Sequence, residues 1–101
     1  MVRTIDIGNK PITFKASGLL PILYRTQTGR DFFVDIQNIG ESEHMLDLAW
    51  IMYRHAGGET EFEPWLEQFA FADLNNALGD IISLLAESQA TTSKAKNPDA
   101  Q

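Results

Sequence analysis

The chain has 101 residues, with fourteen acidic and eight basic side chains and a formal net charge of −6. A chain of this length forms one domain with a modest core. The acidic balance argues against nucleic-acid binding, because contacts to a phosphate backbone depend on clustered Lys and Arg. The absence of cysteine excludes disulfides, thiolate nucleophiles and cysteine-based zinc sites. The longest nearly apolar run, residues 45–53, is far shorter than the roughly 20 residues of a membrane crossing, so we expect no membrane partner.

The charge is unevenly distributed along the chain. Residues 1–30 hold five basic side chains and one acidic side chain, whereas residues 31–87 hold twelve acidic side chains and one basic one. An acidic body of this kind either keeps a small protein soluble or attracts a basic protein partner. The sequence leaves both interpretations open.

The first fifteen residues predict a β-hairpin. Residues 3–7 and 11–15 alternate apolar and polar side chains, and Gly8, Asn9 and Lys10 lie between them. An isolated hairpin is marginal in water, so its apolar face must lie against the rest of the domain. The side chains expected on that face are Ile5, Ile7, Ile12 and Phe14.

Two short helices are predicted to meet at Gly29. Ser17 is a suitable N-cap for the first helix, and Pro21 is tolerated in its first turn. Gly29 supplies a left-handed residue that ends it, and Asp31 caps a second helix that stops at Gly40. One face of the first helix is shared by Leu20, Leu23, Tyr24 and Gln27, and the buried stripe expected in the second helix is Phe32, Phe33, Ile36 and Ile39.

The joint between these helices carries two arginines and an aspartate. Arg25 lies one turn before Gly29, where a cation can satisfy the last carbonyls of a helix. We expect Asp31 to cap the second helix and to pair with an arginine as well. Structural duty is the favoured interpretation of this joint, and direct contact with a partner is the alternative. The joint comprises Tyr24, Arg25, Gly29, Arg30 and Asp31.

Three further helices follow. A third helix, capped by Ser42 and ended at Gly57 and Gly58, is apolar on nearly every side over residues 45–53 and is expected to be the central helix. Pro64 suits the first position of a fourth helix. Asp73 is expected to cap a fifth, in which Gly79 marks close packing or a tolerated weakness. The apolar side chains of that fifth helix are Leu74, Leu78, Ile81, Ile82 and Leu85.

These elements predict a mainly α fold of the α+β kind. A hairpin at about residues 3–15 precedes a compact bundle of about five short helices, in a single domain over residues 1–87. Residues 88–101 carry no apolar anchor, so we expect a disordered polar tail there.

No pattern in the chain indicates catalysis, a metal or a cofactor. His44 and His55 lie on the same predicted helix but about 16 Å apart at about 1.5 Å per residue, too far to share a metal ion. The serines fall in caps, helix surfaces or the tail, and the glycines do not form a phosphate-binding loop. We therefore expect a protein that is not an enzyme.

Several short motifs together resemble one protein family. They are Leu-Tyr-Arg at 23–25, Gly-Arg-Asp at 29–31, Ala-Trp-Ile-Met at 49–52 and Glu-Pro-Trp-Leu-Glu-Gln-Phe at 63–69. Their order and spacing, after a short hairpin, resemble those of the tail assembly chaperones of long-tailed bacteriophages and prophages of Gram-positive bacteria. The resemblance covers roughly residues 3–85.

The resemblance implies a role in virion assembly. Such chaperones bind the long, helical tape measure protein, keep it soluble, and are displaced as tail tube protein arrives. It places the chain in the cytoplasm of the bacterial host and outside the mature virion. Many family members also exist in a longer, frameshifted form, and the polar tail after Glu87 lies where such an extension would attach. The family carries no catalytic residues.

The aromatic side chains give the candidate partner-binding residues. A small helical domain can present an apolar surface to a partner helix, and the same surface can pair with a second copy. The candidates are Trp50, Trp65, Phe69 and Phe71. The alternative function is a small adaptor or regulatory protein of a mobile element that binds a different protein partner.

Overall fold

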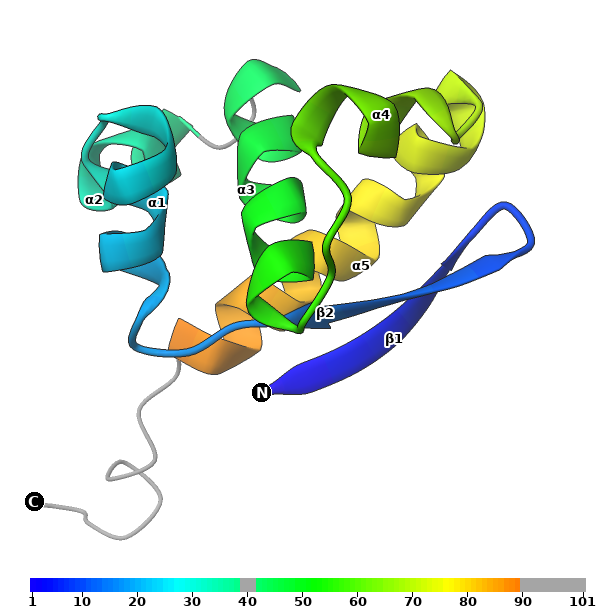
Figure 1. The fold of residues 1–101 in the computed structure, drawn as a ribbon. Coiled ribbons are helices and arrows are strands. Elements are labelled where there is room, and N and C mark those ends of the chain that lie inside the picture. The colour runs from blue at the N-terminus through cyan, green and yellow to red at the C-terminus, as the bar shows by residue number, and fades with distance from the viewer. Residues whose placement is uncertain (39–41, 90–101) are drawn as a thin grey trace, which may run out of the picture.

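The computed structural model describes residues 1–38 and 42–89 and confirms the mainly α fold with an N-terminal hairpin (Figure 1). In the described part of the chain, two antiparallel strands precede five α-helices and one 3₁₀ turn. The elements are β1 (Val2–Ile7), β2 (Lys10–Lys15), α1 (Leu20–Thr28), α2 (Phe32–Asp35), the 3₁₀ turn η1 (Ile36–Asn38), α3 (Ser42–His55), α4 (Phe62–Glu67) and α5 (Phe71–Gln89).

The hairpin is supported on its apolar face by two helices. Ile5 lies opposite Ile12 across the two strands, which are joined by a tight turn at Gly8 and Asn9. Strand β2 packs on α3, and β1 packs on α5. As predicted, Ile5, Ile7 and Phe14 are buried, and Ile12 packs against the core from a partly buried position.

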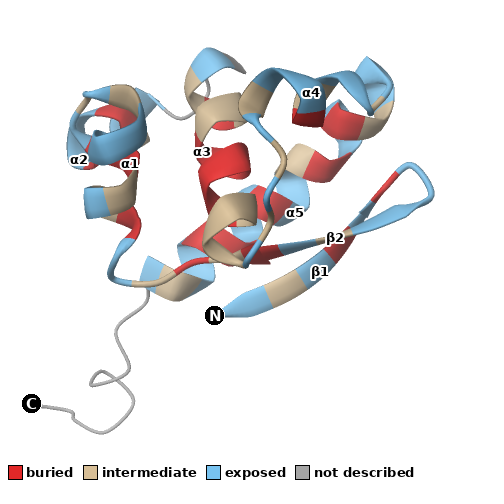
Figure 2. Cartoon of the chain, viewed as in Figure 1, coloured by how far each residue is buried: buried red, intermediate tan, exposed pale blue. Residues whose placement is uncertain are grey.

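Helix α3 is the centre of the fold, as its all-round apolar character predicts. It contacts β2, α1, α4 and α5, and Figure 2 shows the middle of the helix buried among them. Gly57, with φ of 105°, follows the end of the helix in the left-handed region. The buried side chains of α3 are Met45, Leu48, Ala49, Trp50, Ile51 and Met52.

An aromatic cluster fixes α4 to α3 and to the hairpin. Trp65 of α4 is fully buried, and its ring stacks on Tyr53 with 5.0 Å between ring centroids. Phe14 and Phe69 contact the same ring edge-on, at 6.3 and 5.3 Å. Aromatic pairs of this geometry contribute about 0.5–1.5 kcal/mol each beyond their buried area. The cluster therefore contributes strongly to the core of this small domain.

Three predicted helix starts are wrong by two or three residues. Leu19, not Ser17, occupies the N-cap of α1, and the Ser17 hydroxyl accepts the Leu19 N–H at 3.2 Å. Pro64 lies in the third position of α4, because Glu61 is the N-cap. Asp73 lies in the first turn of α5, which begins two residues earlier. The helix begins later than its side-chain signal in α1 and earlier in α4 and α5, and shifts of this size are close to the usual uncertainty of helix ends.

The second predicted helix is shorter than expected, and its buried face differs. Helix α2 spans four residues and continues as the 3₁₀ turn η1, whose tighter winding rotates the following side chains. Phe33, predicted to be buried, is 62% exposed, whereas Asp35 is 8% exposed. The predicted positions of Ile39 and Gly40 lie outside the described residues.

Helix α5 continues to Gln89, two residues past the predicted end of the domain. The remaining positions of the predicted tail, 90–101, lie outside the described residues. Leu74, Ile81 and Leu85 are buried as predicted, while Ile82 is 39% exposed. A Cβ added at Gly79 would meet nothing within 4 Å, so this glycine is a weakness and does not mark close packing.

We therefore expect Gly79→Ala to stabilise the domain by up to about 1 kcal/mol, because alanine lowers the backbone entropy lost in a helix. Gly8→Ala is the opposing control. Gly8 has φ of +66°, and a Cβ there would lie 2.8 Å from the Asp73 carboxylate, so this change should destabilise. Urea unfolding followed by circular dichroism measures both effects. A destabilised Gly79→Ala variant would contradict the open surroundings of this position.

Candidate functional site

The joint between α1 and α2 is organised by the guanidinium group of Arg30. Its Nε donates to Asp35 at 2.7 Å, and its Nη2 donates to Asp47 of α3 at 2.7 Å. The same Nη2 lies 3.0 Å from the Tyr24 hydroxyl, which donates to the Asp35 carboxylate at 2.6 Å. These contacts tie α1, α2 and α3 together around one cation.

The network explains how the Asp35 carboxylate is buried in its charged form. Hydrogen bonds from Arg30, and then from Tyr24, lower the pKa of Asp35, although burial opposes them. Burial, reinforced by the hydrogen bond to Asp35, raises the pKa of Tyr24 to about 12. His44 Nε2 also approaches the Asp35 carboxylate at 3.8 Å. A buried charge needs such partners, because an unpaired one costs several kcal/mol.

The other joint residues divide between confirmed and wrong expectations. Gly29 has φ of 75° and its N–H donates to the Arg25 carbonyl at 2.8 Å, so it is the predicted C-cap. Asp31 is the predicted N-cap and accepts from the backbone N–H of Phe33 at 2.8 Å. The predicted ion pair between Asp31 and an arginine is not formed, because Arg30 pairs with Asp35 and Asp47 instead. The Arg25 side chain is exposed and makes no hydrogen bond or ion pair with the residues that the structure describes.

The capped joint determines which phenylalanine reaches solvent. Phe32 is 6% exposed and contacts the Tyr24 ring edge-on, with 5.8 Å between centroids. The next residue, Phe33, contacts Phe32 at 5.4 Å but lies above it at the surface. The anchoring of Phe32 and Asp35 therefore leaves Phe33 on the outside of α2.

The exposed apolar side chains gather on these two short helices. Among the described residues, four of the eight exposed large apolar side chains lie between positions 19 and 34, and these are Leu19, Ile22, Phe33 and Val34. We define the α1–α2 surface as Pro21, Ile22, Phe32 and Phe33. A hollow of about 310 Å³ is lined by these four residues together with Arg25, Thr26 and Asp31.

A second hollow, of about 220 Å³, adjoins the α1–α2 surface on its other side. It shares Pro21, Phe32 and Phe33 with the first and extends to Leu85 and Ser88 near the end of α5. Phe33 thus borders both hollows. An exposed aromatic side chain between two apolar recesses is typical of an interface for another protein.

Most of the aromatic candidates from the sequence belong to the core. Trp65 is fully buried and Trp50 is 8% exposed, so neither side chain is available to a partner on the surface. Phe69 is partly buried against Trp65. Phe71 is 80% exposed but lies at the start of α5, away from the α1–α2 surface.

Sequence reasoning missed Ile22 and Phe33 as surface residues. Ile22 lies outside the face of α1 that contains the buried Leu20 and Tyr24. An apolar side chain in such a position indicates an exposed apolar residue, and this signal was present in the sequence. No comparable signal marks Phe33, because its exposure depends on the fold of α2.

Within residues 1–38 and 42–89, no group of three or more His, Cys, Asp or Glu side chains is arranged to hold a metal ion. None of the helices in this part of the chain is both long and apolar enough to span a membrane. Comparison with known protein families, curated proteins and solved structures finds no match to this chain.

We expect Arg30→Gln to destabilise the domain by about 2 kcal/mol, because it leaves the buried Asp35 carboxylate without its main partner. Arg25→Gln is the matched control on the same joint and should change the free energy of unfolding by no more than about 0.5 kcal/mol. Urea unfolding at pH 7 compares the two. Equal effects of the two substitutions would show that the network does not hold the joint.

The lowered pKa of Asp35 also predicts a pH dependence. Because its pKa in the folded state lies below that in the unfolded chain, its stabilising contribution is complete above about pH 4 and is lost as the pH falls further. Asp35→Asn should therefore cost about 1.5 kcal/mol at pH 6 and progressively less towards pH 3. Urea unfolding of both proteins across this range measures the difference. A constant difference would rule out titration of Asp35 as its source.

Proposed function

We propose that this chain is a tail assembly chaperone of a long-tailed bacteriophage or prophage. In this role it binds the tape measure protein in the cytoplasm of the bacterial host and keeps it soluble until tail tube protein displaces it. The observation that carries the proposal is the α1–α2 surface. This apolar surface lies on the same helix–glycine–helix joint whose residues carry the resemblance to that family.

The shape of the α1–α2 surface suits an amphipathic helix. Its two most exposed side chains are Ile22 and Phe33. The two hollows beside Phe33 can accept apolar side chains that are spaced along one face of a partner helix. The Arg30 network holds α2 in place, so little order has to be gained on binding. A surface with few exposed anchors binds reversibly, which a chaperone that must later be displaced requires.

The first hollow of the α1–α2 surface carries one basic and one acidic side chain, Arg25 and Asp31, whereas the rest of the domain is acidic and would attract a partner with basic side chains beside its apolar face. Residues 31–87 carry twelve acidic side chains and one basic side chain. Opposite charges on the partner would speed association and make the complex sensitive to salt. When no partner is bound, two copies of the chain can pair through the same apolar surface, because it would otherwise stay exposed to water.

The proposal predicts that a long, helical tape measure protein is encoded near this chain, and co-expression of the two proteins tests the function. We expect this chain to co-purify with that protein and to raise its soluble fraction. Phe33→Glu should abolish co-purification, because it places a charge in the middle of the α1–α2 surface. Phe71→Glu is the matched control, since Phe71 is also an exposed aromatic but lies elsewhere. Circular dichroism should show both variants folded.

Three outcomes would contradict parts of this proposal. Failure of the wild-type chain to bind or solubilise the long protein would refute the chaperone function. A neighbourhood without tape measure and tail tube genes would favour the adaptor function instead. Loss of binding in Phe71→Glu, with Phe33→Glu unaffected, would refute the α1–α2 surface as the binding site.

A further inference from the structure

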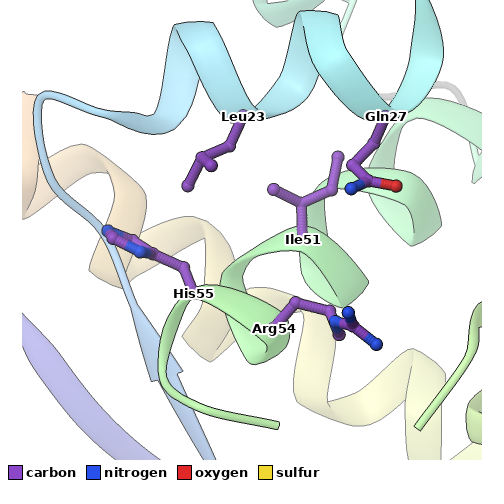
Figure 3. A pocket seen from close by; sticks show the side chains of 5 residues that line it. All are labelled: Leu23, Gln27, Ile51, Arg54 and His55. Atoms are coloured by element: carbon purple, nitrogen blue, oxygen red, sulfur yellow. The ribbon is translucent and has the colours of Figure 1, made fainter. Parts of the chain in front are cut away.

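A third hollow, between α1 and α3, differs in chemistry from the α1–α2 surface. It has a volume of about 280 Å³ and is lined by Leu23 and Gln27 of α1 and by Ile51, Arg54 and His55 of α3 (Figure 3). Leu23 and Ile51 give it an apolar wall, whereas the other three side chains carry hydrogen-bonding groups. No acidic residue lines it, although the chain has fourteen acids and eight bases.

Arg54 is held at the edge of this hollow by weak and partial contacts. Its guanidinium lies over the Trp50 ring, 5.5 Å from the centroid, and its Nη1 donates to the Glu59 carbonyl at 3.1 Å. The nearest carboxylate, on Glu61, is 3.5 Å from Nη1, and its side chain is 78% exposed. An exposed ion pair of this kind contributes at most about 1 kcal/mol. The guanidinium N–H groups of Arg54 can therefore donate to an anion that binds in the hollow.

His55, which also lines the hollow, is held in place by a hydrogen bond and carries no charge at pH 7. His55 Nε2 and the Ser17 hydroxyl oxygen form a hydrogen bond of 2.8 Å, and that oxygen also accepts the Leu19 N–H. Burial, followed by the positive charge of Lys15, lowers the pKa of His55. The imidazole is therefore neutral at pH 7, and the permanent charge of the lining residues belongs to Arg54.

From this arrangement we propose that the hollow binds a carboxylate that carries a short apolar chain. The chain would lie on Leu23 and Ile51, and the carboxylate would displace Glu61 from Arg54. The volume is slightly below the range of about 300–1,000 Å³ for ligand pockets, so it suits a group the size of one side chain. Either a free organic acid or the C-terminus of a peptide ending in an apolar residue has this chemistry. The proposal does not depend on the chaperone function.

Titration of the full, ¹⁵N-labelled chain with hexanoate, followed by NMR, tests the proposal. We expect saturable shifts of the backbone amides of Leu23, Gln27, Ile51, Arg54 and His55. Hexanamide has the same apolar chain without the charge, and it should bind at least about fivefold more weakly, as expected for the loss of one partly exposed ionic contact.

Two substitutions with opposite expected effects make the test specific. Arg54→Gln should weaken hexanoate binding roughly fivefold, because it removes the cation. Glu61→Gln should strengthen binding roughly twofold, because it removes the competing carboxylate. Lys10→Gln removes a positive charge at the tip of the hairpin and should leave the affinity unchanged. The NMR spectrum of each variant reports whether it is folded.

The peptide acetyl-Gly-Gly-Leu and its C-terminal amide distinguish the two sources of the carboxylate. Binding of the free peptide and not of its amide would identify a peptide C-terminus as an accepted ligand, whereas binding of hexanoate alone would identify a free acid. The proposal is overturned if hexanamide binds as well as hexanoate, if a folded Arg54→Gln variant binds unchanged, or if the shifts lie elsewhere in the domain.

Discussion

The arrangement of α1, α2 and α3 depends on the ion pairs of Arg30. Asp35 is 8% exposed, and a carboxylate is stable there because Arg30 and Tyr24 donate to it. The same guanidinium reaches Asp47 on the central helix, so the direction of α2 relative to α3 is set by charge as well as by packing. Without this network, α2 has four residues and too few hydrogen bonds to hold its own position.

Helix α1 is shared by both proposed binding sites. Consecutive residues of a helix point about 100° apart, so Ile22 belongs to the α1–α2 surface while Leu23 lines the hollow against α3. A change in the tilt of α1 would therefore alter both recesses. The Arg30 network and the Gly29 C-cap fix that tilt at the end of the helix, where α1 leads into α2.

In this small domain, most of the large aromatic side chains are used in the core and few are left on the surface. Trp65 contacts both Tyr53 and Phe14, and these contacts connect α4, α3 and the hairpin. In a chain of 101 residues, such large side chains supply much of the buried area that a modest core requires. The apolar side chains exposed on α1 and α2 are consequently other residues, chiefly Ile22 and Phe33.

Local signals in the sequence determined the class of fold, the hairpin, the central helix, the Gly29 C-cap and the Asp31 N-cap. Each of these depends on residues close together in the chain: alternation of apolar side chains, a left-handed glycine or a capping carboxylate. Tertiary structure decided the partners of Arg30, the burial of Asp35 and the exposure of Phe33, because these depend on how α1, α2 and α3 meet around Arg30. It also decided that Trp50 and Trp65 belong to the core, since periodicity shows which residues share a face and not what covers that face.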